Sequence, residues 1–216
     1  MDDPALDPAE YDRVLKDLSQ VNRWTLTARP TLSFLKRATR GMTSFRLLDV
    51  GFGQGDMLRS ISRWARVRGL EAELVGVDLN PNSVASARAS TPPELGIEYV
   101  AGDYADVPGP FDLVTSSLVA HHMTDEQLLR FLRFMEAEAR VGWMVNDLHR
   151  HRFAHAGYPL LARMLGVHRI VREDGTLSIA RGFRRAEWIE MLKEAGVGGS
   201  KVARRFPFRL CVERLR

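Results

Sequence analysis

A short glycine-rich loop is the first feature of this sequence whose residue types and spacing suggest chemistry. The segment Asp49-Val-Gly51-Phe-Gly53-Gln-Gly55 follows a short apolar run and precedes a run of helical spacing. Glycines at such a place allow the backbone to approach a ligand closely and to turn tightly into a helix N-terminus. The spacing is G-x-G-x-G, and Asp56 stands where a dinucleotide fingerprint has its third glycine. A carboxylate there disfavours a pyrophosphate, so the loop argues against a nicotinamide cofactor.

Three aspartates follow three successive expected strands. Asp49 precedes the glycine loop, Asp78 ends a Val-Gly-Val-Asp segment, and Asp103 stands in a Gly-Asp-Tyr segment. Asp49 suits a cationic amine, Asp78 can accept from both hydroxyls of a ribose, and Asp103 can meet an adenine amino group. A single aspartate at such a place is more often a helix N-cap or part of a solvated turn. Three aspartates at one edge of a sheet favour a ligand site over three separate caps or turns. They fit S-adenosylmethionine (SAM), which carries an ammonium and a sulfonium but no phosphate.

A pair of adjacent histidines supplies the first candidates for proton transfer. His121 and His122 follow the fourth expected strand and precede the helix cap Thr124. A neutral imidazole near the sulfonium can take a proton from a phenol, enol or hydroxyl while the methyl group moves. The alternative is that both rings only pack against the turn, which for one of the pair is the more frequent outcome. We favour His121 as the residue that faces the substrate.

A second polar cluster ends the fifth expected strand. It contains Asn146, Asp147, His149 and His151. His149 or His151 can act as a base or orient one, and Asn146 or Asp147 can bind the acceptor. An evenly weighted alternative is a helix cap at Asp147 followed by a solvated basic turn.

The periodicity of the apolar residues predicts the elements that position these side chains. Short apolar runs predict strands over 45–50, 73–78, 97–101, 111–116 and 141–146, and two further strands over 201–206 and 208–214. Helical spacing predicts helices over about 8–24, 31–38, 57–65, 81–89, 125–139, 154–165 and 185–195. Alternating strands and helices indicate βαβ units and a parallel sheet, whose ligands bind at the carboxyl ends of the strands.

The composition fits one globular domain. The 216 residues carry 31 basic and 27 acidic side chains, a net charge of +4, and 45% of them are hydrophobic. No apolar stretch approaches the roughly 20 residues of a membrane span, and the scattered arginines favour a solvated surface over a nucleic-acid face. Cys211 is the single cysteine, so no internal disulfide is possible and we expect a cytoplasmic location.

The motifs together resemble those of class I SAM-dependent methyltransferases. Residues 47–55 are similar to the first motif of that family, 75–81 to its acidic-loop motif, 102–104 to its adenine-side motif and 111–117 to its fourth-strand motif. The resemblance covers residues 45–147. It implies a Rossmann-like α/β fold with helices on both faces of a seven-stranded sheet, mostly parallel, with an antiparallel edge strand.

The resemblance also implies roles for individual residues, with SAM as cofactor and S-adenosyl-L-homocysteine (SAH) as product. The implied cofactor contacts are Gly51, Gly53 and Gly55 at the methionine part, Asp78 and Leu79 at the ribose loop, Asp103 and Tyr104 beside the adenine, and Ser117 near the methionine end. The segment around His121 resembles that of quinone-pathway methyltransferases and their secondary-metabolite relatives.

The flanking segments are expected to cover the site. By analogy with related enzymes, residues 1–44 form a helical lid in which Arg23 pairs with the SAM carboxylate and Trp24 stacks on an acceptor ring. The alternative for these two is a surface arginine and an aromatic anchor in the core. Residues 148–183 read as a substrate-side insertion, where Tyr158 and neighbouring aromatics line an acceptor pocket or simply belong to the core. Residues 184–216 complete the single domain with a helix and the edge strands.

These observations predict methyl transfer to a small, aromatic acceptor such as a phenol, quinol or polyketide-like molecule, most often at oxygen. N- or C-methylation, RNA methylation and SAM binding without transfer are the alternatives. No spacing of acids or of Cys and His predicts a metal site. We expect no nucleic-acid partner, and a monomer or homodimer.

Overall fold

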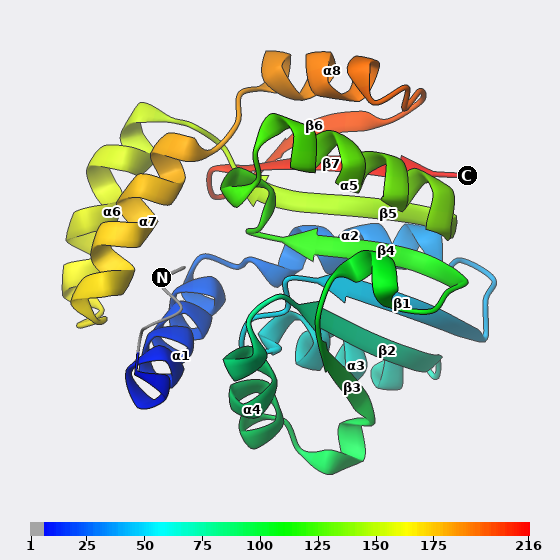
Figure 1. Cartoon of the computed structure of the whole chain (residues 1–216), viewed down its shortest axis with the longest axis horizontal. Coiled ribbons are helices and arrows are strands. Elements are labelled where there is room, and N and C mark those ends of the chain that lie inside the picture. Colours follow the sequence, from blue (N-terminus) through cyan, green and yellow to red (C-terminus); the bar gives the residue numbers. More distant parts are fainter. Residues whose placement is uncertain (1–6) are drawn as a thin grey trace.

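A seven-stranded sheet forms the centre of the protein, which we describe from a computed structural model over residues 7–216. The strand order is β3-β2-β1-β4-β5-β7-β6 (Figure 1). The strands are β1 (Ser44–Val50), β2 (Glu71–Asp78), β3 (Ile97–Ala101), β4 (Phe111–Ser117), β5 (Ala139–Leu148), β6 (Lys201–Arg205) and β7 (Arg209–Leu215). Strands β1 to β5 are parallel, and β7 runs antiparallel to both β5 and β6. The expected Rossmann-like methyltransferase sheet is confirmed, with the antiparallel strand β7 one place inside the edge strand β6.

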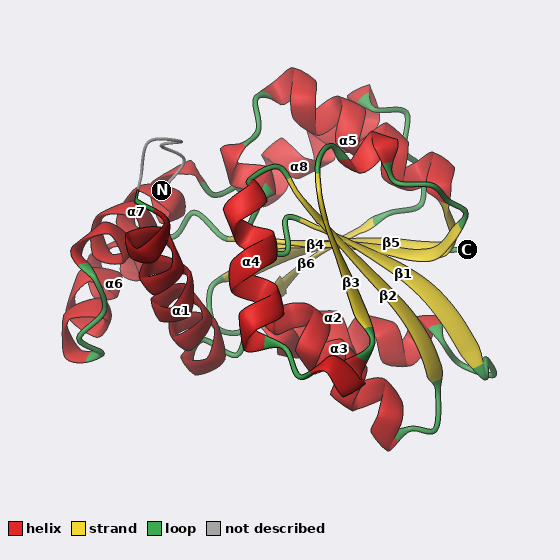
Figure 2. Ribbon diagram, turned by 60° about the horizontal axis from the view of Figure 1, so that its bottom comes forward, coloured by secondary structure: helices red, strands yellow, loops and turns green. Residues whose placement is uncertain are grey.

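Helices cover both faces of this sheet (Figure 2). One face packs against α2 (Ala28–Ala38), α3 (Asp56–Val67) and α4 (Pro81–Ser90), and the other against α5 (Asp125–Glu138) and α8 (Arg185–Glu194). Phe34 and Leu58 are fully buried on the first face, as are Phe131 and Trp188 on the second. Burial of these apolar side chains holds the strands in register and so fixes where their carboxyl ends lie.

Three further helices gather at one end of the sheet (Figure 1): α1 (Pro8–Trp24), α6 (Arg152–Met164) and α7 (Arg169–Arg181). Helix α1 begins at Asp7, whose side chain accepts from the backbone N–H of Ala9 at 2.9 Å and of Glu10 at 3.2 Å. The three helices share a small apolar core of their own, formed by Val14, Val21, Ala162, Val167 and Val171. This core holds the group together where the parallel strands end.

The expected flanking segments differ from the structure in two respects. Residues 148–183 contain two helices, and the apolar periodicity predicts only α6; in α7 the glycine at position 175 and mixed polarity conceal the helical period. Helix α2 packs against β5, β7 and α3, so it belongs to the sheet layer, and within residues 7–44 the helix that lines the site is α1. Residues 1–6 of that lid lie outside the described residues.

Three short 3-10 turns complete the chain: η1 (Pro93–Leu95), η2 (Tyr104–Asp106) and η3 (Ala120–His122). Within residues 7–216, no helix is both long and apolar enough to cross a bilayer.

Candidate active site

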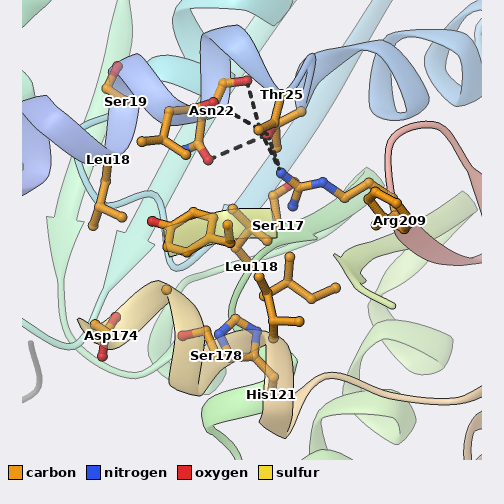
Figure 3. Close-up of a pocket in the computed structure, with 18 of the residues that line it drawn as sticks. Leu18, Ser19, Asn22, Thr25, Ser117, Leu118, His121, Asp174, Ser178 and Arg209 are labelled. Carbon is orange, nitrogen blue, oxygen red and sulfur yellow. Dashed lines mark hydrogen bonds between the residues drawn. The ribbon is translucent and has the colours of Figure 1, made fainter. Parts of the chain in front are cut away.

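A cavity of about 430 Å³ lies at the carboxyl ends of the strands, between α1, the glycine loop and the α6–α7 pair (Figure 3). It is the place where the resemblance positions the methionine part of a cofactor and an acceptor. Eight of the expected site residues line it: Asp49, Gly51, Gly53, Ser117, His121, His122, His149 and Tyr158.

The glycine loop adopts a backbone that other residues tolerate poorly. Gly51, Gly53 and Gly55 have φ angles of 76°, 54° and 77°, in the left-handed region that favours glycine. A Cβ on Gly51 would lie 2.2 Å from Val119 Cγ2, and one on Gly55 would lie 2.3 Å from Tyr99 Oη. The loop therefore needs glycine both for its turn and for close packing beneath the cavity.

Replacing Gly51 by alanine is expected to lower the free energy of unfolding by about 1–3 kcal/mol, from backbone strain and the contact with Val119. Gly69→Ala is the matched control, because Gly69 has a φ of 67° but a Cβ added there would meet no atom within 4 Å. Chemical denaturation of both variants separates strain from crowding. Equal losses in the two variants would show that the contact with Val119 contributes nothing.

Asp49 lies fully buried at the end of β1. Its Oδ1 accepts a hydrogen bond from Thr115 Oγ1 at 2.8 Å. Burial raises the pKa of this carboxyl to about 7, and the charges of Asp56 and Asp78 add to the rise while the Thr115 bond opposes it. A buried acid that titrates near neutral pH suits a cationic ligand, because a positive charge nearby restores the ionised form.

This raised pKa predicts a pH dependence of both binding and stability. Asp49 ionises near pH 3.8 in the unfolded chain and near pH 7 in the folded protein. The free energy of unfolding of the ligand-free protein therefore falls as the pH rises from about 4 to about 7. Above that range Asp49 is ionised in both states, and its contribution no longer changes. Asp49→Asn keeps an oxygen for Thr115, and at pH 8 it should be more stable than wild type by up to about 4 kcal/mol. At pH 3 the difference in stability should vanish.

The affinity of the wild type for SAM should rise from pH 6 to pH 8, and that of Asp49→Asn should change less. Calorimetry at both pH values tests this.

Asp78 ends β2 beside the loop without lining the cavity itself. Its Oδ2 accepts from the N–H of Gly53 and its Oδ1 from the N–H of Asn80, each at 2.9 Å. Burial raises the pKa of this carboxyl although both bonds oppose the rise. The Ser83 side chain also donates to this carboxyl, and a carboxylate has about four lone-pair sites, so it can still accept from a further donor. The next residue, Leu79, is 78% exposed.

The adenine-side residues lie further along the same edge. Asp103 is exposed, and its Oδ1 accepts from the N–H of Ala105 at 2.9 Å at the start of η2. The ring of Tyr104 packs on those of Phe131 and Phe134, at centroid distances of 5.0 and 4.7 Å. Both residues lie outside the cavity, and their contact with adenine stays a prediction.

His121 and Asp147 form a buried pair at the floor of the cavity. His121 Nδ1 lies 2.6 Å from Asp147 Oδ1, and the N–H of His121 donates to Asp147 Oδ2 at 3.0 Å. The two side chains are 2% and 0% exposed. Burial alone would raise the pKa of the Asp147 carboxyl, but the charge of His121 and hydrogen bonds from His121 and Leu148 lower it below its usual value. An ionised Asp147 accepts the hydrogen on His121 Nδ1, which orients the ring and makes Nε2 the ring nitrogen that remains for another partner.

Comparison with known proteins agrees with this geometry. Residues 47–142 match a family described as a methyltransferase domain. No curated protein shows significant similarity to the chain. The glycine loop, Asp78 and the fourth strand all fall inside the matched region. Residues 47–142 form a class I SAM-dependent methyltransferase domain.

Solved methyltransferases share its fold. The magnesium protoporphyrin IX methyltransferase of Synechocystis PCC 6803, solved with SAH, aligns with a TM-score of 0.61 and 18% identity over 93% of this chain and 86% of its own. A plantazolicin methyltransferase aligns with a TM-score of 0.67 and 15% identity, over 97% of this chain and 98% of its own. Human N-acetylserotonin methyltransferase, solved with SAM, aligns with a TM-score of 0.68 and 17% identity, over 97% of this chain and 56% of its own. At these identities the likeness is one of fold.

The cavity of this methyltransferase fits the methionine end of SAM. The loop leaves no room for a Cβ at Gly51, and Asp49 offers a buried carboxyl beside it. Ser117 Oγ is buried and has no hydrogen-bond partner among the described residues, so it is available to a ligand. Within the described chain, no group of three His, Cys, Asp or Glu side chains is placed to hold a metal ion.

Two other histidines lie near the His121–Asp147 pair. The ring of His122 packs on that of His121 with centroids 4.2 Å apart, and both line the cavity. His149 also lines it, and burial lowers the pKa of its imidazole, helped by Arg204 and His151. His151 itself does not line the cavity; its Nδ1 accepts from the N–H of Phe153 at 3.3 Å and so begins α6.

Three residues with expected contacts do not line the cavity. Arg23 and Trp24 do not line the cavity, because the face of α1 that does so presents Leu18 and Asn22; Arg23 is exposed and Trp24 is 65% exposed. Asn146 is fully buried, and its Nδ2 donates to Thr27 O at 2.8 Å and to the Thr31 hydroxyl at 3.2 Å. These bonds tie the start of α2 to β5.

Tyr158 lines the cavity, but its hydroxyl donates to Val171 O at 3.0 Å and thereby joins α6 to α7. Burial raises the pKa of this phenol to about 12, so it stays protonated. Only its ring is offered to a ligand. Gly175 makes room for it, since a Cβ there would lie 2.3 Å from the Tyr158 ring.

Sequence reasoning missed two features of the site. One is the role of Asp147 as the partner of His121, which the pairing of adjacent parallel strands β4 and β5 would have indicated. The other is Arg209 at the start of β7, whose only signal was its place after the turn at 206–208. Both depend on which strands are neighbours, and local sequence does not show that.

Proposed function

We propose that this methyltransferase transfers the methyl group of SAM to an oxygen of a small aromatic acceptor, such as a phenol, a quinol or a polyketide-like molecule. The observation that carries the proposal is the buried His121–Asp147 pair in the cavity wall. A carboxylate that orients an imidazole is the arrangement expected of a general base. A general base is needed by acceptors that lose a proton during methyl transfer, above all by hydroxyl groups.

In this proposal each residue has a defined task. SAM supplies a methyl group already activated by its sulfonium. Asp147 holds His121 with Nε2 available, and His121 Nε2 takes the proton of the acceptor hydroxyl. Asp78 binds the ribose, and the loop at Gly51 admits the methionine part. Helices α1, α6 and α7 exclude water and orient the acceptor, which supplies most of the acceleration in a displacement of this kind.

The acceptor half of the cavity supports an apolar, aromatic molecule. Its wall comes from α6, α7 and the turn before β7, with mainly apolar side chains: Phe153, Ala154, Leu161, Ile179 and Phe208. Such a wall binds flat rings through burial of apolar area. Asp174 and Ser178 of α7 also line it and add polar groups on the same side.

N- or C-methylation of a small molecule is the second candidate, since the same cavity admits such acceptors and His149, whose pKa is lowered by burial, is a second imidazole at the wall. RNA methylation lacks a supporting feature in the described chain. We also keep a cytoplasmic location as a prediction, supported by the single cysteine, Cys211, which is buried and unpaired.

Methyl transfer from labelled SAM tests the proposal. The purified protein is offered phenols, quinols, polyketide-like aromatics, small amines and bulk tRNA, and products are identified by mass. Methylation of an aromatic hydroxyl supports the proposal. Label in an amine, in a carbon position or in tRNA, with none in any hydroxyl, contradicts it.

A further inference from the structure

Arg209 stands out among the side chains of the cavity. Of the described residues that line it, Arg209 is the one arginine or lysine, and it is only 4% exposed. Its Nη2 donates to Thr27 Oγ1 at 2.6 Å and to Thr25 Oγ1 at 3.1 Å (Figure 3). Its Nη1 is buried and has no hydrogen-bond partner in the described part of the chain.

This guanidinium carries a charge that the described residues do not neutralise by contact. Asp147 and Asp56 are near enough to oppose a fall in its pKa, yet neither forms an ion pair with it. Burial lowers the pKa of Arg209 to about 10, so the group is still charged at neutral pH. A buried charge without a partner is costly, and in proteins it is normally compensated. An anion that arrives with a ligand would compensate it.

We propose that Arg209, held in place by Thr25 and Thr27, binds a carboxylate that enters the cavity as part of a ligand. A planar guanidinium with free N–H groups matches the two oxygens of a carboxylate. The inference needs a SAM-binding cavity but not the proton transfer proposed for His121. The family resemblance implies that Arg23 pairs with the SAM carboxylate, but Arg23 lies outside the cavity. In this proposal Arg209 of β7 can take that role.

A line of hydrogen bonds connects Arg209 to Asp56, an acid that also lines the cavity. Thr27 Oγ1 donates to Asn22 Oδ1 at 3.4 Å, and Asn22 Nδ2 donates to Asp56 Oδ2 at 3.4 Å. A cation and an acid joined by two bridging side chains suit a zwitterion, with its carboxylate at Arg209 and its ammonium towards Asp56. The methionine part of SAM is such a group. A carboxylate on the acceptor is the other source of the same chemistry.

Calorimetry with SAM and with decarboxylated SAM tests the first source. If the carboxylate belongs to the cofactor, the wild type binds SAM at least about tenfold more tightly than the decarboxylated form. Arg209→Met then lowers the affinity for SAM to that for decarboxylated SAM and leaves the latter unchanged. Arg209→Lys, which keeps the charge but loses the fork of donors, falls between the two.

Titration of the SAH-saturated protein with benzoate and with its neutral match benzamide tests the second source. If the carboxylate belongs to the acceptor, benzoate binds at least about tenfold more tightly than benzamide. Arg209→Met then abolishes that preference without changing the affinity for SAM.

Arg205→Met is the matched control, because Arg205 pairs with Arg209 across the β6–β7 hairpin but is exposed. It should leave both preferences intact. If Arg209→Met does not fold, Arg209→Lys is the second variant, and a preference left unchanged in it also counts against the role of Arg209. A wild type that prefers neither SAM over decarboxylated SAM nor benzoate over benzamide overturns the proposal.

Discussion

Replacing His121 by alanine is expected to lower kcat for a hydroxyl acceptor by about 10²–10⁴, the usual contribution of a positioned general base. The affinity for SAH should change little, because His121 contacts Asp147 and the cavity rather than the glycine loop. Asp147→Asn should produce a similar but smaller loss. It keeps the shape of the side chain but removes the charge that fixes the imidazole hydrogen on Nδ1.

Steady-state rates and calorimetry on the same preparations separate these effects. His155→Ala is the matched control, since His155 lies exposed on α6 and does not line the cavity. If His121→Ala keeps the wild-type kcat, the base lies elsewhere, and His149 is the next residue to replace. If His121→Ala loses SAH binding as well, the residue acts on the structure of the site rather than on the proton.

Replacing Asp78 by alanine should weaken SAH binding by about 100-fold or more. Two charge-assisted hydrogen bonds to the ribose hydroxyls would be lost, each worth about 1.5–3 kcal/mol. The change also frees the N–H groups of Gly53 and Asn80, so loosening of the loop adds to the loss. Calorimetric titration with SAH measures the effect.

Glu71→Ala is the control for this variant, because Glu71 is an exposed acid at the opposite end of the same strand β2. Thermal unfolding of both variants checks that β2 is intact. A folded Asp78→Ala protein that binds SAH within a few-fold of wild type would rule out the ribose assignment.

Much of the fold is open to sequence reasoning because its signals are local. The strand over 97–101 has the predicted bounds, and the other strands differ by a few residues at their ends. The glycine loop is recognisable from residue types that only a left-handed backbone explains, as at Gly51 and Gly55. Asp7 likewise indicates where α1 begins, since a cap acts within three residues.

The features that sequence reasoning misplaces depend on tertiary arrangement. The place of Arg23 in the sequence suggests a cofactor contact, but the direction it faces is set by how α1 packs on α6 and α7. Asn146 has the chemistry of a substrate ligand, yet the start of α2 folds over it and takes up its donors. Arg209 becomes a candidate only because β7 lies beside β5, which brings a residue near the C-terminus against Thr25 and Thr27.

The measurement that tests the proposed chemistry most directly compares His121→Ala with wild type on two acceptors of different acidity. One is a simple phenol, which is protonated at the assay pH, and the other a nitrophenol acidic enough to be ionised there. If His121 removes the acceptor proton, the variant should be about 10²–10⁴ slower on the simple phenol and nearly as fast as wild type on the ionised one. An equal loss of rate on both acceptors would contradict the account.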